Sequence, residues 1–156
     1  MLRRHLPSQA ATAALAAEIA PSLTTGSVLL LTGQLGCGKT TFVRHLVTEL
    51  GGSPDQVASP TFALLHWYQT TPPVVHVDAY RLHAAEDLWG IGYHDLAETA
   101  IACIEWPERV AEAFVTTHCW RIELEHARGE SRQATVFPPF GQALARIPHE
   151  QRREKS

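Results

Sequence analysis

The sequence contains few cysteines and no recognisable zinc or disulfide pattern. Cys37, Cys103 and Cys119 stand far apart, without a C-x-x-C pair or an even-numbered framework. This spacing argues against a disulfide scaffold and a thiolate zinc site, and it suits a reducing compartment, so we expect a cytoplasmic protein. The nine histidines are scattered, and H-E-x-x-H is missing. They therefore do not indicate a metalloprotease-like centre.

The sequence also has little net charge and no long apolar run. Thirteen basic and sixteen acidic side chains leave a net charge of −3 over 156 residues. No global field draws the chain to nucleic acid or to anionic membranes, so contact with RNA would be local or through a partner. No run reaches the roughly 18 apolar residues of a membrane-spanning helix, and polar residues interrupt the N-terminal segment. We expect no membrane association.

What the sequence does contain is a glycine-rich loop between an apolar run and a helical pattern. Within "LTGQLGCGKTTF", Gly33, Gly38, Lys39 and Thr40 fit G-x-x-x-x-G-K-[ST], the phosphate-binding P-loop. The pattern predicts phosphates held by backbone N–H groups of residues 36–39, with Lys39 at the β- and γ-phosphates and the Thr40 hydroxyl on Mg²⁺. The predicted cofactor-binding residues of this loop are Gly33, Gln34, Leu35, Gly36, Cys37, Gly38, Lys39, Thr40 and Thr41.

Apolar runs and turn signals around this loop predict an α/β fold. The predicted strands are residues 27–32, 61–68, 74–78, 101–106, 119–126 and 133–137, and the predicted helices are residues 9–20, 40–50 and one from Pro107. Residues 84–96 predict short helical pieces. We expect a P-loop NTPase-like three-layer sandwich whose mixed sheet has a parallel centre and a C-terminal antiparallel hairpin. We expect one P-loop ATPase domain over residues 1–137 and a polar tail over 138–156.

Two predicted strands end in a carboxylate. Asp78 closes "VVHVD" and Glu105 closes "IACIE". Because ligands gather at the carboxyl ends of parallel strands, both side chains are expected near the nucleotide. One would hold Mg²⁺ and the other would orient or deprotonate a water. We therefore predict Asp78, Glu105 and Lys39 as the catalytic residues, and a helix-capping role remains the alternative for either carboxylate.

Two further features stand near the predicted site. In "ASPTF", Ser59 and Thr61 flank Pro60. These hydroxyls fit a switch loop that senses the γ-phosphate and equally fit ordinary turn chemistry. Trp106 directly follows Glu105 and is predicted at the nucleotide, whereas core or interface roles are expected for the other tryptophans.

Taken together and in order, "TGQLGCGKTTFVRHL", "SPTFALLHWY", "HVDAYRL", "EDLWGIGYHDL" and "IEWPERV" resemble the TsaE (YjeE) family. These are small bacterial P-loop ATPases needed for threonylcarbamoyladenosine (t6A) at position 37 of tRNAs. The resemblance covers about residues 7–137. The P-loop alone would indicate only an NTPase, and the other segments make the resemblance specific.

The resemblance implies roles for particular residues and partners. Thr40 and Glu105 would hold Mg²⁺, Asp78 would be important for hydrolysis, and Ser59–Thr61 would form the switch-like loop. Residues 8–12 would approach the adenine. The family works with TsaB and TsaD, which carry out the threonylcarbamoyl transfer, so TsaB and TsaD homologues are the expected partners and tRNA is met indirectly. ATP hydrolysis, weak without partners, would reset that complex.

The sequence departs from the family at a few positions and leaves two other functions open. Gln34 stands where the family often has an acidic residue, Cys37 where Ala is usual, and Ala79 where Leu is common. The change at Gln34 questions a catalytic role there but not phosphate binding. A small-molecule or nucleoside kinase is one alternative, although residues 84–96 lack the basic side chains of a lid. A nucleotide-dependent scaffold without essential hydrolysis is the other.

Overall fold

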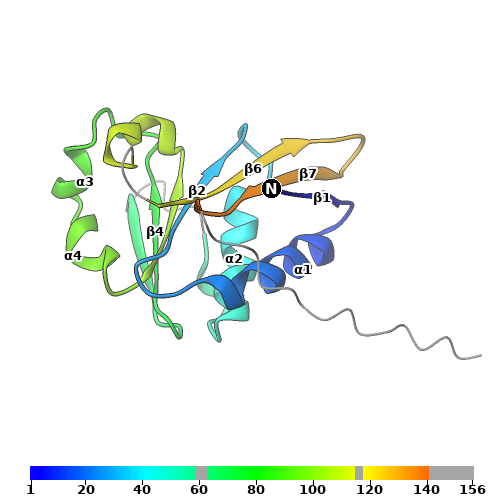
Figure 1. The fold of residues 1–156 in the computed structure, drawn as a ribbon, viewed down its shortest axis with the longest axis horizontal. Coiled ribbons are helices and arrows are strands. Elements are labelled where there is room, and N and C mark those ends of the chain that lie inside the picture. The colour runs from blue at the N-terminus through cyan, green and yellow to red at the C-terminus, as the bar shows by residue number, and fades with distance from the viewer. Residues whose placement is uncertain (59–62, 115–117, 141–156) are drawn as a thin grey trace, which may run out of the picture.

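The computed structural model describes residues 1–58, 63–114 and 118–140, and all strands in this part of the chain join one seven-stranded mixed sheet (Figure 1). The strands are β1 (Leu2–Leu6), β2 (Val28–Thr32), β3 (Leu65–Tyr68), β4 (Val74–Asp78), β5 (Ile101–Glu105), β6 (Trp120–His126) and β7 (Arg132–Phe137). Their order across the sheet is β1-β7-β6-β2-β5-β4-β3. The central pairs β6–β2, β2–β5 and β5–β4 are parallel, and the outer pairs are antiparallel. The predicted α/β fold class, with its parallel centre and C-terminal hairpin, is confirmed.

Helices cover both faces of this sheet and give the molecule three layers. They are α1 (Gln9–Ile19), α2 (Lys39–Glu49), α3 (Asp87–Gly90) and α4 (Tyr93–Ala97), with 3₁₀ helices η1 (Ala20–Ser22), η2 (Pro54–Gln56) and η3 (Pro107–Phe114). One core packs α1 and α2 against the sheet, and a second core packs α3, α4 and η3 against the other face. Figure 1 shows α3 and α4 on the opposite side of β4 from α2.

The two inner strands that end in carboxylates are buried throughout, whereas β6 is not. Every residue of β4 and β5 is buried, as expected for parallel strands that have helices on both faces. In β6 the first five residues alternate between buried and exposed, because helices cover only one of its faces there. The continuous apolar runs of β4 and β5 therefore belong to strands covered on both faces, and the alternating run of β6 belongs to a strand covered on one.

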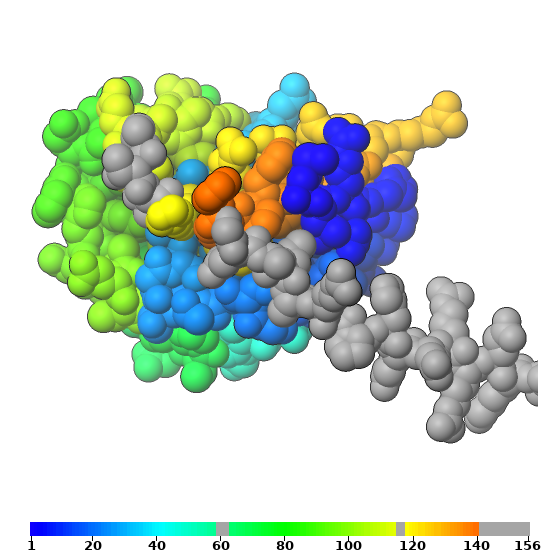
Figure 2. Space-filling view, viewed as in Figure 1, coloured from blue at the N-terminus to red at the C-terminus, as the bar shows by residue number. Residues whose placement is uncertain are grey.

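Strand β1 was not predicted from the sequence. Residues 3–5 are exposed, and the strand runs antiparallel to β7, with Leu2 opposite Val136. Figure 2 shows this N-terminal strand, in dark blue, on the surface beside β7, in orange. An edge strand of charged residues carries almost no apolar alternation, so its pairing with β7 is not visible in the local sequence.

Two other boundaries differ from the prediction. The expected strand over 61–68 begins only at Leu65, since Leu64 has a positive φ of 64°, and residues 59–62 lie outside the described residues. The expected α-helix from Pro107 is the 3₁₀ helix η3, interrupted where Val110 leaves helical geometry. Its buried residues are Pro107 and Val110, a spacing of three that matches the three residues per turn of a 3₁₀ helix.

The sheet and α2 bring the predicted functional residues to one edge. Asp78 is opposite Glu105 in the β4–β5 register, and Glu105 is opposite Leu31 of β2, the strand that leads into the glycine loop. Helix α2 follows this loop directly and packs against the sheet through Phe42 and Leu46, which are fully buried. Each such side chain contributes about 2 kcal/mol of hydrophobic stabilisation. None of the described helices is long and apolar enough to cross a membrane.

Candidate nucleotide-binding site

A cavity of about 440 Å³ lies where the glycine loop meets the ends of β4 and β5. Its lining includes both strand-terminal carboxylates and most of the predicted loop. The lining residues are Leu35, Gly36, Gly38, Lys39, Thr40, Thr41, Asp78, Tyr80, Glu105 and Trp106. Residues that are separate in the sequence thus form one concave site, as the strand-end argument predicts.

The glycines of the loop adopt conformations that other residues rarely reach. Gly36 and Gly38 have φ angles of 76° and 105°, and Gly38 is the N-cap of α2. A glycine has no side chain that could accept hydrogen bonds from the first-turn N–H groups of α2. The N-cap residue therefore supplies no side-chain partner for these N–H groups. This end of the helix therefore retains the donors and the positive dipole end that bind anions.

One detail of the loop differs from the expectation. The Cys37 N–H donates to the Gln34 carbonyl oxygen at 3.2 Å, so in this structure that donor is used within the turn. From the outside, the Arg132 guanidinium of β7 donates to the Gly36 carbonyl oxygen at 3.2 Å, a support that the sequence does not reveal. One hydrogen bond within the loop and one from Arg132 of β7 thus stabilise the loop conformation.

Gly33 is required for close packing rather than for flexibility alone. A Cβ atom here would lie 2.3 Å from the Leu124 carbonyl oxygen and 2.5 Å from Cys37 Sγ. We expect Gly33→Ala to lower the free energy of unfolding by about 3 kcal/mol, because backbone and buried side chain would both have to move. Urea denaturation measures this change.

Gly90→Ala is the control for that prediction. At Gly90 of α3 no heavy atom lies within 4 Å of the added Cβ, and no positive φ applies. The expected change is within about 0.5 kcal/mol. Equal denaturation midpoints for wild type and Gly33→Ala would contradict the packing argument.

Lys39 is buried and bonded to its own loop. Its Nζ donates to the carbonyl oxygens of Gly33 at 2.5 Å and Gln34 at 3.1 Å. The same Nζ lies 4.1 Å from the ring centroid of Trp106. The ammonium therefore sits at the cavity wall with carbonyl and aromatic partners, and a bound phosphate would compete for its protons.

Trp106 connects the loop to the cavity rim. It has a positive φ of 57°, and its ring meets Tyr80 edge-on at a centroid distance of 5.0 Å. The Arg109 guanidinium lies 5.0 Å from the Tyr80 ring centroid. A continuous series of cation–π and aromatic contacts thus runs from Lys39 through Trp106 and Tyr80 to Arg109.

The Lys39–Trp106 contact predicts a fluorescence response. Nucleotide phosphates would attract the Lys39 ammonium and change its position over the indole, so we expect ADP or ATP to change the tryptophan emission. Titration of wild type, Trp106→Phe and Trp89→Phe measures it. The change should disappear in Trp106→Phe and persist in Trp89→Phe, since Trp89 is exposed on α3. An unchanged response in Trp106→Phe would refute the assignment.

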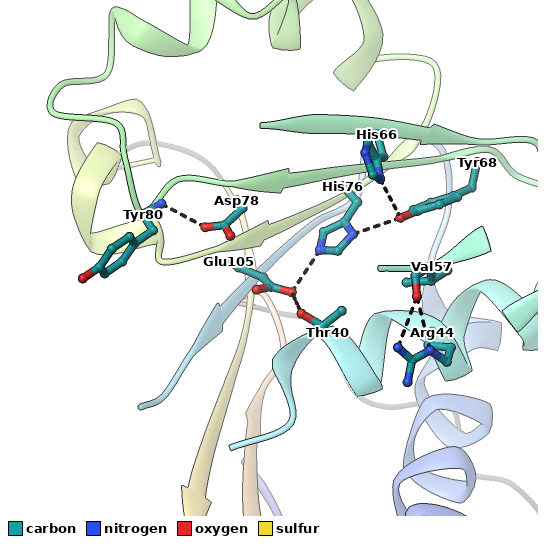
Figure 3. Close-up of polar contacts among 9 residues, drawn as sticks. All are labelled: Thr40, Arg44, Val57, His66, Tyr68, His76, Asp78, Tyr80 and Glu105. Atoms are coloured by element: carbon teal, nitrogen blue, oxygen red, sulfur yellow. Dashed lines mark hydrogen bonds and ion pairs between the residues drawn. The ribbon is translucent and has the colours of Figure 1, made fainter. Parts of the chain in front are cut away.

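Thr40 and Glu105 both line the cavity, and a hydrogen bond joins them (Figure 3). The Thr40 hydroxyl donates to Glu105 Oε1 at 2.7 Å, and His76 Nε2 lies 3.0 Å from the same oxygen. Burial raises the pKa of Glu105, but the hydrogen bonds from His76 and Thr40 and the positive charge of Lys39 more than offset burial and lower it. Glu105 is therefore a buried carboxylate held in its ionised form.

Asp78 lies beside this pair. It is buried, lines the cavity, and accepts a hydrogen bond from the Tyr80 N–H at 3.0 Å. A hydroxyl and two carboxylates around one cavity are hard oxygen donors, the ligand type that Mg²⁺ prefers together with water and phosphate oxygens. The donor set of Thr40, Asp78 and Glu105 thus fits a Mg²⁺–nucleotide complex. No cluster of three His, Cys, Asp or Glu side chains among the described residues forms an all-protein metal site.

The remaining predicted residues fall into three groups. Leu35 is 85% exposed at the cavity rim. Gly33 and Gln34 do not line this cavity and instead line a second cavity beside β6. Cys37 is buried, and burial raises the pKa of its thiol despite the opposing Lys39 charge, which favours a packing role over redox reactivity. Ser59 and Thr61 lie outside the described residues.

The sequence reasoning missed Tyr80 and His76. Tyr80 lines the cavity, and His76 contacts Glu105 from within β4. A signal for His76 is present in retrospect, because a histidine interrupts an otherwise apolar strand two residues before Asp78 and therefore shares its face.

This fold and site define a P-loop nucleotide-binding α/β protein. The family model described as threonylcarbamoyl adenosine biosynthesis protein TsaE matches residues 6–134. The chain belongs to the TsaE family, and the resemblance stated from its sequence is confirmed.

Individual relatives agree with this assignment. The chain is 36% identical over 133 residues to the "tRNA threonylcarbamoyladenosine biosynthesis protein TsaE" of Rickettsia felis, covering 85% of this chain and 77% of that protein. It is 41% identical over 112 residues to the protein of the same name in Treponema pallidum, covering 71% and 82%. Among solved structures, Bacillus subtilis YdiB matches with a TM-score of 0.67 and 25% identity over 88% of this chain and 85% of that one.

Proposed function

We propose that this protein binds and hydrolyses ATP with Mg²⁺ and that its hydrolysis supports t6A formation at position 37 of tRNAs. The observation that carries the proposal is the convergence of Lys39, Thr40, Asp78 and Glu105 on one cavity at the glycine loop. A simple nucleotide-binding scaffold needs the loop and the lysine. It does not need two buried carboxylates beside the phosphate position, and their presence favours hydrolysis.

Each residue of this set has a proposed task. Backbone donors of the loop and Lys39 bind the phosphates, and Thr40 and Glu105 hold Mg²⁺, which neutralises charge on the phosphates when bound. Asp78 orients the attacking water. Trp106 packs at the phosphate end of the nucleotide, and the hydroxyls of Ser59 and Thr61 sense the γ-phosphate.

We further propose that TsaB and TsaD homologues are the partners, that tRNA is met through their complex, and that the protein acts in the cytoplasm. The names of the relatives, which link them to t6A biosynthesis, support the pathway. Among the described residues no arginine lines the cavity itself, which is consistent with a partner supplying an arginine during hydrolysis. Hydrolysis by the chain alone is therefore expected to be weak.

ATP turnover with and without partners tests this function. We expect little hydrolysis by the purified chain and a clear rise with TsaB and TsaD from the same source, with Lys39→Ala as the blank. Unchanged turnover with both partners, or phosphate transfer to a small acceptor in their absence, would overturn the proposal and favour a kinase. Loss of turnover with t6A formation intact would favour the scaffold alternative.

A further inference from the structure

His76 is a buried histidine that the proposed function does not use. It lies in β4 with none of its surface exposed. Strand alternation puts it on the face of Val74 and Asp78, and the register places it opposite Cys103 of β5. An apolar residue would pack at this position without burying any polar group. A buried histidine does bury polar groups, and both of its ring nitrogens therefore require hydrogen-bond partners.

Both nitrogens have them (Figure 3). The Tyr68 hydroxyl lies 3.3 Å from His76 Nδ1, and Glu105 Oε1 lies 3.0 Å from Nε2. An ionised carboxylate only accepts hydrogen bonds, so Nε2 must carry the proton and donate it. Tyr68 is buried too, and burial, followed by neighbouring acidic groups, raises its pKa to about 12, so its hydroxyl keeps its proton and can donate to Nδ1.

The chain of contacts extends to the edge of the sheet. His66 Nδ1 lies 3.3 Å from the Tyr68 hydroxyl oxygen, and these two side chains share one face of β3. Donation from His66 to Tyr68, from Tyr68 to His76 and from His76 to Glu105 gives a partner to both ring nitrogens of His76 and to the Tyr68 hydroxyl. At its far end Thr40 donates to the same Glu105 oxygen.

The consequence concerns the orientation of one carboxylate. Donors from two elements, Thr40 of α2 and His76 of β4, converge on Glu105 Oε1. Both bonds use this oxygen, which leaves Oε2 for a further partner at the cavity. With a single donor the carboxylate could rotate about its last bond, and with two its plane is fixed.

We propose that His76 is a positioning residue that holds Glu105 by donating its Nε2–H, with the Tyr68 hydroxyl fixing the opposite ring nitrogen. The proposal rests on the role of Glu105 in the proposed function. His76 acts only through Glu105 and touches no nucleotide. It determines how well the nucleotide site uses Mg²⁺ rather than whether the phosphate loop forms.

Nitrogen NMR of the wild-type ring tests the hydrogen-bond arrangement directly. In ¹⁵N-labelled protein the His76 signals are assigned by their loss in His76→Gln. We expect a proton on Nε2. A His76 ring protonated on Nδ1 alone would overturn the proposal, and this readout needs neither nucleotide nor hydrolysis.

ADP affinity with and without Mg²⁺ tests the consequence. We expect His76→Leu to reduce the Mg²⁺-dependent gain in affinity about tenfold, since partners that orient metal ligands typically contribute about 10- to 100-fold. The affinity without Mg²⁺ should stay within about twofold. His76→Gln retains an N–H donor at a similar distance and should restore most of the gain. Tyr68→Phe, which frees the ring orientation, should fall between them.

His45→Leu is the matched control. His45 lies on α2, is partly buried, and its Nε2 has no hydrogen-bond partner within the described part of the chain. It should alter stability without altering the Mg²⁺-dependent gain. An unchanged gain in His76→Leu, or an equal loss in His76→Gln and His76→Leu, would overturn the proposal. Absence of ATP hydrolysis by wild type with its partners would instead refute the proposed function and leave both tests of His76 intact.

Discussion

Glu105→Gln is expected to lower partner-stimulated ATP hydrolysis by about 100-fold or more while nucleotide binding persists. The substitution keeps the size of the side chain and removes its negative charge. In the wild type, Thr40 and His76 both donate hydrogen bonds to Oε1 of this carboxylate. It also places an amide where His76 presents its own donor. Removing one group that stabilises charge in a preorganised site typically lowers kcat about 10²- to 10³-fold. Single-turnover hydrolysis measures the effect.

Glu108→Gln separates this effect from a general loss of acidity. Glu108 is exposed, lies in η3 three residues beyond Glu105, and does not line the cavity. It should hydrolyse ATP at the wild-type rate. Hydrolysis by Glu105→Gln within about threefold of wild type would contradict the role assigned to this carboxylate, which P-loop mechanisms place on the metal.

Lys39→Ala is expected to weaken ATP binding by about 10- to 100-fold. Its ammonium is at the loop, buried and held by the carbonyl oxygens of Gly33 and Gln34, so it is already close to where phosphates would bind. Hydrogen bonds to charged groups contribute about 1.5–3 kcal/mol, and about 1.4 kcal/mol corresponds to tenfold in affinity. Calorimetric titration with ATP and Mg²⁺ measures the change.

Arg128→Ala removes the same charge outside the site. Arg128 is exposed in the β6–β7 turn, which projects from the described surface in Figure 2. Its ATP affinity should equal that of wild type. Wild-type affinity in Lys39→Ala would show that the loop binds phosphate without its lysine. An equal loss in Arg128→Ala would show that net charge alone decides binding.

The site was predictable where local pattern and sheet geometry determine it. The P-loop spacing predicts that a helix starts at Lys39 and Thr40. The left-handed turn before this helix requires glycine, and a glycine at its end leaves the first N–H groups of the helix free to bind phosphate. Asp78 and Glu105 were predicted to converge because parallel strands end at one edge, and the register places them opposite each other. Both inferences use rules that hold without knowledge of tertiary contacts.

The parts that were missed depend on contacts between distant segments. Strand β1 pairs with β7 at the other end of the chain, and its exposed Arg3 and Arg4 carry no apolar pattern. His76 gains its role only because Tyr68 of β3 and Glu105 of β5 lie on either side of its ring. Neither the polar neighbour nor the bond direction can be derived from spacing along β4.

Formation of t6A on unmodified tRNA, by TsaB and TsaD with this protein or its Lys39→Ala variant, tests the central claim most directly. With the threonylcarbamoyl donor and ATP supplied in excess, the account predicts repeated turnover with the wild-type chain. With Lys39→Ala, product should not exceed about one equivalent of the TsaB–TsaD complex, since under the proposed function that complex would no longer be reset. Equal multiple-turnover yields with both chains would contradict the claim that ATP use at this cavity supports tRNA modification.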